Sequence, residues 1–140
     1  MSRALEKILN VDRDWKVALV GVGNLGRAIA GYGGFAHRGF RITHLFDSDP
    51  AKVGEQITET LSVLPMERMK ETLRSEGIQI AMLTVPADEA QAVADDLVEA
   101  GVRAILNYAP IVITVPEGVY VQYIDPVIHL QRMTYYLTSK

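Results

Sequence analysis

One short segment constrains the fold of this chain more than any other: the stretch KVALVGVGNLGRAIAG, residues 16–31. A continuous apolar run ends at Gly21, and Gly23 and Gly26 follow at the spacing G-x-G-x-x-G before a helical pattern begins. In such a strand–turn–helix unit the glycines allow a tight turn, close approach of a pyrophosphate, and close packing of helix on strand. The N–H groups at the start of the helix then face the phosphates. The segment therefore predicts a dinucleotide-binding turn.

Strand and helix patterns alternate along the chain, which predicts a Rossmann-like α/β fold with a doubly wound parallel sheet. A length of 140 residues suits one domain. Apolar runs predict strands at 17–21, 40–47, 57–64 (a minor one), 78–85, 102–106 and 119–124. Helical patterns predict helices at 24–31, 51–55, 65–76 and 88–100, and a final helix from Pro126 with Val127, Leu130, Met133 and Leu137 on one face.

The chain is expected to have three parts: a linker helix (1–15), a dinucleotide-binding Rossmann domain (16–125) and a C-terminal helix (126–140). The last helix begins at Asp125, an acidic N-cap, followed by Pro126 at the first helical position. Its apolar face follows the last strand of the sheet. From the residues alone, this helix packs either on its own sheet or against a partner chain.

The composition excludes several kinds of site. The chain has no cysteine, which rules out disulfides, thiolate metal sites and a cysteine nucleophile, and no other metal-ligand spacing occurs. Its net charge of −3, with both signs mixed, argues against a broad nucleic-acid-binding surface. No apolar run approaches the roughly 20 residues that span a bilayer, and the charged N-terminus lacks a signal-peptide core. We therefore expect a cytoplasmic protein without membrane contact.

Asp47 ends the second predicted strand, about 20 residues after the last glycine, where an acidic residue binds the adenosine ribose. A carboxylate at this place accepts hydrogen bonds from the ribose hydroxyls and repels a 2′-phosphate. Ser48 rather than an arginine follows it, so NAD(H) is expected in preference to NADP(H). Asp49 fits better as a turn residue before Pro50.

Two further strand ends are expected at the same crevice, "TVP" at 84–86 and "NYAP" at 107–110. Each places a polar residue where the chain leaves the sheet, followed by a proline-fixed turn. These residues either line the nicotinamide half of the cofactor site or form ordinary strand exits, and spacing alone does not decide between the two.

The sequence offers no catalytic residue that would use a bound dinucleotide. The three histidines lie in a predicted loop, a strand and the last helix, and no clustered carboxylates or Ser/Lys pair accompanies them. We therefore expect a binding domain and not an enzyme. Two alternatives stay open: the nucleotide domain of an NAD-dependent dehydrogenase, and a CoA-binding domain. Asp47 argues against the second, because CoA carries a 3′-phosphate near that strand end.

Six motifs in succession cover essentially all 140 residues: VALVGVGNLGRAI, FDSDPAKVG, IAMLTVP, AGVRAILNYAP, VPEGVYVQYID and LQRMTYYL. In this order and spacing the chain resembles the redox-sensing transcriptional repressors of the Rex family. The resemblance implies the NAD(H)-binding domain of a homodimeric repressor that binds NADH more tightly than NAD⁺ and releases DNA when NADH binds. It further implies that operator DNA is bound through an N-terminal winged-helix domain, which these 140 residues do not include.

The resemblance also implies roles for individual residues. The pyrophosphate would be held by Gly21, Val22, Gly23, Asn24, Leu25 and Gly26. Asp47 would bind the ribose, and the adenine end would be bordered by Lys52, Val53 and Gly54. The nicotinamide would be bordered by Thr84, Val85, Pro86, Asn107, Tyr108, Ala109 and Pro110. The last helix would be exchanged between subunits, and Tyr32 would pair with the partner subunit's Asp125 when NADH is bound.

Overall fold

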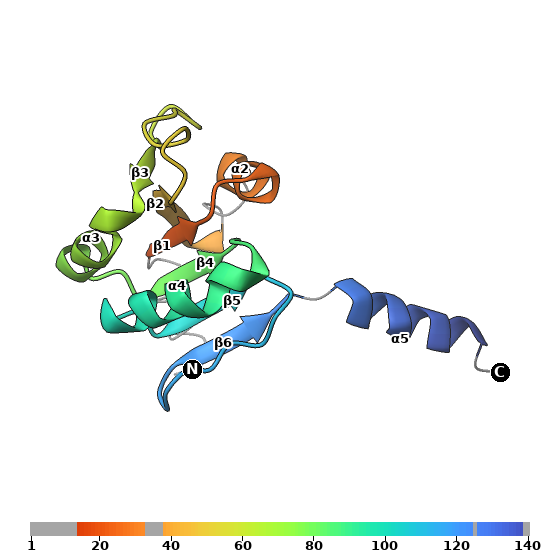
Figure 1. The fold of residues 1–140 in the computed structure, drawn as a ribbon. Coiled ribbons are helices and arrows are strands. Elements are labelled where there is room, and N and C mark those ends of the chain that lie inside the picture. Colours follow the sequence, from red (N-terminus) through yellow and green to blue (C-terminus); the bar gives the residue numbers. More distant parts are fainter. Residues whose placement is uncertain (1–13, 33–37, 125, 139–140) are drawn as a thin grey trace, which may run out of the picture.

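The computed structural model describes residues 14–32, 38–124 and 126–138, and in these ranges it contains a six-stranded parallel sheet. The strand order is β3-β2-β1-β4-β5-β6 (Figure 1). The strands are β1 (Trp15–Val20), β2 (Phe40–Asp47), β3 (Val63–Pro65), β4 (Ile80–Leu83), β5 (Ala104–Asn107) and β6 (Tyr120–Tyr123). The order reverses between β1 and β4, as in the doubly wound Rossmann fold. The predicted fold class is therefore confirmed.

Helices cover both faces of this sheet, and one face buries a larger hydrophobic cluster than the other. The helical elements are α2 (Asn24–Gly31), the short 3-10 turn η2 (Met66–Arg68), α3 (Met69–Glu76), α4 (Ala87–Glu99) and α5 (Pro126–Thr138). One face buries Phe46 and Leu83 against α3 and α4, while the other buries Leu19 and Leu45 near α2. Since β1 and β4 bury side chains on both faces, each contains a continuous apolar run, VALV in β1 and IAML in β4.

The helix predicted at residues 51–55 is wrong, because this segment forms a turn. The Asp49 carboxylate accepts a hydrogen bond from the Ala51 N–H, and this bond stabilises a turn as readily as a helix start. Gly54 has a φ of +89° and its N–H donates to the Val63 carbonyl, while the Val63 N–H donates to the Glu55 carbonyl. The segment is therefore held against the start of β3.

The boundary near Pro65 also differs from the prediction. Strand β3 covers only three residues, and Pro65 ends it in extended conformation (φ −72°, ψ 148°) instead of opening a helix. The helix that follows ends as predicted at Gly77, whose φ of +67° favours glycine. Within the predicted linker helix, Asp14 is not helical and strand β1 begins at Trp15, while residues 1–13 lie outside the described residues.

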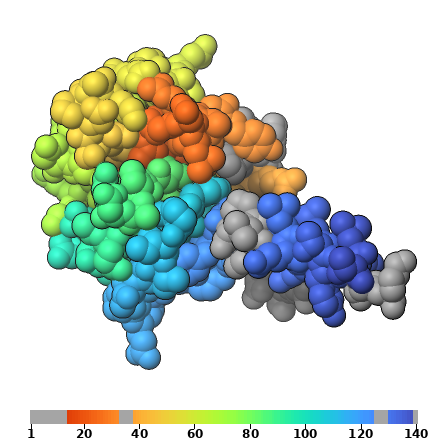
Figure 2. Space-filling view, turned by 45° about the vertical axis from the view of Figure 1, so that its right-hand side comes forward, coloured from red at the N-terminus to blue at the C-terminus, as the bar shows by residue number. Residues whose placement is uncertain are grey.

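Helix α5 extends away from the sheet (Figure 1) and forms a projection from the body of the molecule (Figure 2). Its large apolar side chains are mostly exposed: Leu130 57%, Met133 59%, Tyr136 82% and Leu137 75%. The described helix therefore does not bury its apolar face on its own sheet. In the ranges that the structure describes, no helix combines the length and hydropathy needed to cross a membrane.

The core of the larger face depends on Leu97 of α4, which is fully buried. We expect Leu97→Ala to lower the free energy of unfolding by about 2–5 kcal/mol, because it leaves a cavity between α4 and the sheet. Leu97→Met, which nearly conserves volume, should cost less than about 1.5 kcal/mol. Urea unfolding followed by circular dichroism measures both values. An equal decrease of the free energy of unfolding in the two variants would contradict the close packing of Leu97 between α4 and the sheet.

Candidate functional site

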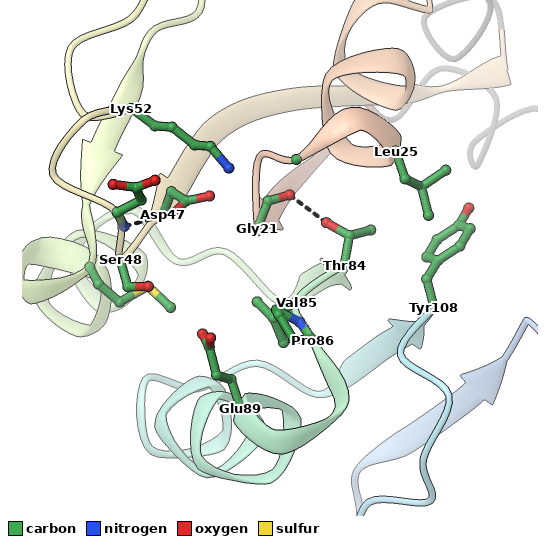
Figure 3. A pocket seen from close by; sticks show the side chains of 13 residues that line it. Gly21, Leu25, Asp47, Ser48, Lys52, Thr84, Val85, Pro86, Glu89 and Tyr108 are labelled. Carbon is green, nitrogen blue, oxygen red and sulfur yellow. Dashed lines mark hydrogen bonds between the residues drawn. The ribbon is translucent and has the colours of Figure 1, made fainter.

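A cleft of about 490 Å³ lies at the carboxyl ends of the strands, where the strand order reverses (Figure 3). This is the place where open α/β sheets bind ligands. The lining residues come from the glycine turn, the end of β2, and the segments that follow β3, β4 and β5. They are Gly21, Gly23, Leu25, Asp47, Ser48, Asp49, Lys52, Met66, Thr84, Val85, Pro86, Glu89 and Tyr108.

The three glycines of the turn meet three different spatial requirements. Gly21 has a φ of +100°, and a Cβ there would lie 2.7 Å from the Thr84 carbonyl oxygen. A Cβ at Gly26 would overlap the Gly21 carbonyl oxygen, so this glycine allows α2 to lie against β1. A Cβ at Gly23 would meet nothing within 4 Å, which leaves open space beside the backbone of the turn. A pyrophosphate fits this arrangement of backbone and open space.

The start of α2 suits an anion for a second reason. The N-cap is Gly23, which has no side chain to bond the first N–H groups, and the first turn carries no acidic residue. The first N–H groups of a helix have no partner within the helix, and they carry the positive end of its dipole. The end of α2 is therefore suited to bind phosphate oxygens.

Asp47 is only 9% exposed, and its carboxylate holds the glycine turn in place. The Val22 N–H donates to Oδ2 over 2.7 Å, and the Asp49 N–H donates to Oδ1 over 2.8 Å. Each carboxylate oxygen has further acceptor capacity. Asp47 therefore ties β2 to the turn and also presents an acceptor to the cleft, which suits the hydroxyls of a ribose.

Thr84 fixes the turn from the other side. Its hydroxyl oxygen lies 2.5 Å from the Gly21 carbonyl oxygen (Figure 3) and 3.0 Å from the Val20 carbonyl oxygen. The Thr84 N–H also donates to the Val20 carbonyl. The side chain thus joins the end of β4 to the end of β1, which explains the polar residue at this strand exit.

An ion pair connects α2 with the segment after β2. Both outer nitrogens of Arg27 donate to the Glu55 carboxylate, over 2.7 and 2.5 Å. These hydrogen bonds raise the pKa of Arg27 and lower the pKa of Glu55. Arg27 is therefore already paired with Glu55. Among the described residues that line the cleft, Lys52 is the one with a cationic side chain, and this side chain points into the cleft (Figure 3).

The loop after β5 is held by its own polar groups. Asn107 is fully buried, accepts from the Ala109 N–H and donates to the Ile111 carbonyl. The Gln91 side chain pairs with both backbone groups of Thr114, so α4 fixes the far end of the same loop. Asn107 therefore acts as an ordered strand exit, and it positions the following residue, Tyr108, which lines the cleft.

The cleft brings together part of the predicted site. It is lined by nine of the predicted residues: Gly21, Gly23, Leu25, Asp47, Lys52, Thr84, Val85, Pro86 and Tyr108. Eight other predicted residues are not among those that line it: Val22, Asn24, Gly26, Val53, Gly54, Asn107, Ala109 and Pro110. Tyr32 lies at the C-cap of α2, away from the glycine turn. The predicted partner of Tyr32, Asp125, lies outside the described residues.

Four lining residues were not among the predicted site residues: Ser48, Asp49, Met66 and Glu89. The first two directly follow Asp47, which is a signal the sequence contains. Met66 and Glu89 follow β3 and β4 in a fold whose strand ends meet, but no local motif distinguishes them. Among the described residues, no group of three His, Asp or Glu side chains could hold a metal ion.

Comparison with known families finds a match for this chain. It is described as a CoA binding domain, and it matches residues 12–111, which include the glycine turn and every residue that lines the cleft.

Among curated proteins, the chain is similar to the "Redox-sensing transcriptional repressor Rex" of Chloroflexus aurantiacus, with 53% identity over 136 residues. The alignment covers 97% of this chain and 64% of that protein. The chain therefore spans less than two thirds of the length of this relative.

Two solved structures of a Rex-family repressor named RSP resemble this fold. RSP in complex with beta-NADH has a TM-score of 0.86 and 36% identity, and the match covers 96% of this chain and 65% of that one. RSP in complex with beta-NAD⁺ and operator DNA has a TM-score of 0.87 and the same 36% identity, covering 96% of this chain and 62% of that one.

The different surroundings of Gly26 and Gly23 lead to a test of the turn. Gly26→Ala should lower the free energy of unfolding by about 1–3 kcal/mol, because its Cβ overlaps backbone that cannot move freely. Gly23→Ala should change it by less than about 0.5 kcal/mol, because its Cβ enters open space. Thermal or urea unfolding of both variants measures the difference. A Gly23 variant as unstable as the Gly26 variant would contradict this geometry.

Proposed function

Because the chain belongs to the CoA binding domain family and is homologous to the Rex repressors along nearly its whole length, we propose that it is the NAD(H)-sensing part of a Rex-type redox-sensing repressor. The observation that carries this proposal is the cleft that joins an uncapped α2 to the Asp47 carboxylate. The first is suited to a pyrophosphate and the second to an unphosphorylated ribose. Together they match one half of a dinucleotide.

In the proposed complex the pyrophosphate lies on the turn from Gly21 to Gly26. The adenosine ribose bonds to Asp47, with Lys52, Val53 and Gly54 toward the adenine end. The nicotinamide lies toward Val85, Pro86 and Tyr108, at the end of the cleft formed by β4 and β5. Thr84, Asn107, Ala109 and Pro110 support this end. The proposed role is binding and not catalysis, since the relatives are named as repressors.

The preference for NADH over NAD⁺ has a physical basis in this arrangement. The oxidised nicotinamide ring carries a positive charge that the reduced ring lacks. Val85, Pro86 and Tyr108 offer mainly apolar surface to the ring, and burying a charge there without a partner is unfavourable. The chain alone leaves Pro86 exposed, so this preference depends on a second element that closes the site.

That second element is, in this proposal, helix α5 of another copy of the chain. The exposed apolar side chains of α5 need a partner surface, since large apolar groups on a projecting helix are unfavourable in water. A homodimer with exchanged α5 helices would cover them and bring the partner subunit's Asp125 toward Tyr32. This pairing is the proposed contact through which bound NADH is detected.

Operator DNA is assigned to the part of a Rex repressor that this chain does not span. The net charge of −3, with both signs mixed, argues against a broad DNA-binding surface on these 140 residues. RSP is known in complex with beta-NAD⁺ and operator DNA. We infer that NADH binding in the present domain changes the dimer so that a DNA-binding domain releases its operator.

The ribose assignment is tested with Asp47→Ala, and Asp49→Ala serves as the control. Asp47→Ala should weaken NADH binding about tenfold or more, because a charged acceptor is lost. It should also narrow the ratio of the affinities for NADH and NADPH, because the carboxylate that repels the 2′-phosphate is removed. Asp49→Ala should leave the preference unchanged. Calorimetry with NADH, NAD⁺, NADPH and CoA measures these affinities, and circular dichroism checks the fold. If the unaltered chain binds CoA and not NADH, the proposed function is wrong.

The assembly is tested on the apolar face of α5. Met133→Asp should convert a dimer into a monomer, because it places a charge in the proposed interface. Thr134→Asp changes the neighbouring exposed position and should leave the dimer intact. Sedimentation velocity gives the mass of each variant in solution. A monomeric unaltered chain, or a dimer that both substitutions leave intact, would contradict the proposed exchange of α5.

A further inference from the structure

One acidic side chain in the cleft has no part in the binding roles described so far. Glu89 lies in the first turn of α4, is half-buried and lines the cleft. Its carboxylate makes no hydrogen bond or ion pair with another residue that the structure describes. In Figure 3 it points into the cleft from the side opposite α2. A half-buried carboxylate without a partner is unfavourable unless a ligand or water bonds to it.

The position of Glu89 follows from the order of binding sites along the cleft. The pyrophosphate is assigned to the glycine turn and the ribose to Asp47, so the base continues from the ribose away from the phosphates. Leu25 and Tyr108 lie at the other end of the cleft (Figure 3), toward the nicotinamide. Besides Lys52, which is already placed toward the adenine end, and Asp49, the lining residues at this end of the cleft are Ser48, Met66 and Glu89.

The chemistry of these groups matches adenine. The exocyclic N6 amino group donates hydrogen bonds, and an ionised carboxylate only accepts them. The thioether of Met66, directly after β3, offers a polarisable surface to an aromatic ring. A hypoxanthine base, which has a carbonyl oxygen in place of the amino group, would direct an acceptor at an acceptor.

We propose that Glu89 is a specificity-determining residue that binds the N6 amino group of adenine in the dinucleotide site. This inference rests on the proposed function of the cleft and adds recognition of the base to it. Glu89 accepts one N6 hydrogen, and Met66 lies against the ring. The site therefore distinguishes adenine from bases that carry an oxygen at this position.

The test compares NADH with its hypoxanthine analogue, reduced nicotinamide hypoxanthine dinucleotide. The unaltered chain should bind NADH about tenfold more tightly, the effect of one charge-assisted hydrogen bond at a half-exposed site. Glu89→Gln should remove most of this ratio, because the amide NH₂ can donate to the hypoxanthine oxygen. Asp88→Asn, which removes the same charge at the exposed neighbouring position, should retain the full ratio. Calorimetry measures all six affinities.

The outcomes separate this inference from the function on which it rests. If neither dinucleotide binds the unaltered chain, the proposed function fails. If both bind with equal affinity, or Glu89→Gln keeps the full ratio, the dinucleotide site stands and the role of Glu89 is wrong. If Glu89→Gln raises the affinity for both dinucleotides by the same factor, Glu89 acts only as a charge near the phosphates, and the inference is again overturned.

Discussion

The hydrogen bond from the Val22 N–H to the Asp47 carboxylate is the interaction on which the site depends. It joins the glycine turn to the end of β2, which is 25 residues further along the chain. On the opposite side, the Thr84 hydroxyl is bonded to the Gly21 carbonyl. Three adjacent strands thus hold the turn in one shape before any ligand binds, and a preformed site loses less conformational entropy on binding.

The elements that were predicted correctly are those whose apolar residues are buried against the sheet, because burial produces a regular pattern in the sequence. Strand β1 and helices α2 and α4 lie where apolar runs and helical spacing put them, because each packs directly on the sheet. The errors concern the segment between β2 and α3, where few residues are fully buried. There Gly54 adopts a positive φ and its N–H donates to Val63 at the start of β3 instead of to a helix, and Pro65 suits a strand end as well as a helix start.

Some site residues could be found from their spacing in the sequence, whereas others are brought to the cleft only by the order of the strands. The glycine turn and Asp47 are separated by a distance that one strand–helix–strand unit fixes, so their spacing in the sequence is sufficient to find them. Met66 and Glu89 follow β3 and β4, and only the order of strands brings them into the same cleft. Asn107 and Thr84 are polar residues at strand ends, and their hydrogen bonds show that each also stabilises the backbone around it.

The charged side chains in the cleft affect how the proposed site would distinguish NADH from NAD⁺. Asp47, Asp49 and Glu89 line it together with Lys52, so the end of the cleft proposed for the adenosine is acidic. The two redox forms differ only at the nicotinamide, and the lining residues proposed to border that ring, Val85, Pro86 and Tyr108, carry no charged side chain. A long separation and solvent screening weaken the influence of the carboxylates on that ring. In the proposed complex, discrimination between the two forms would then depend on how completely the ring is desolvated, and an open cleft in one chain leaves the ring in contact with water. In the proposed complex, the exposed apolar face of α5 and the open nicotinamide end of the cleft would both be covered by a second chain.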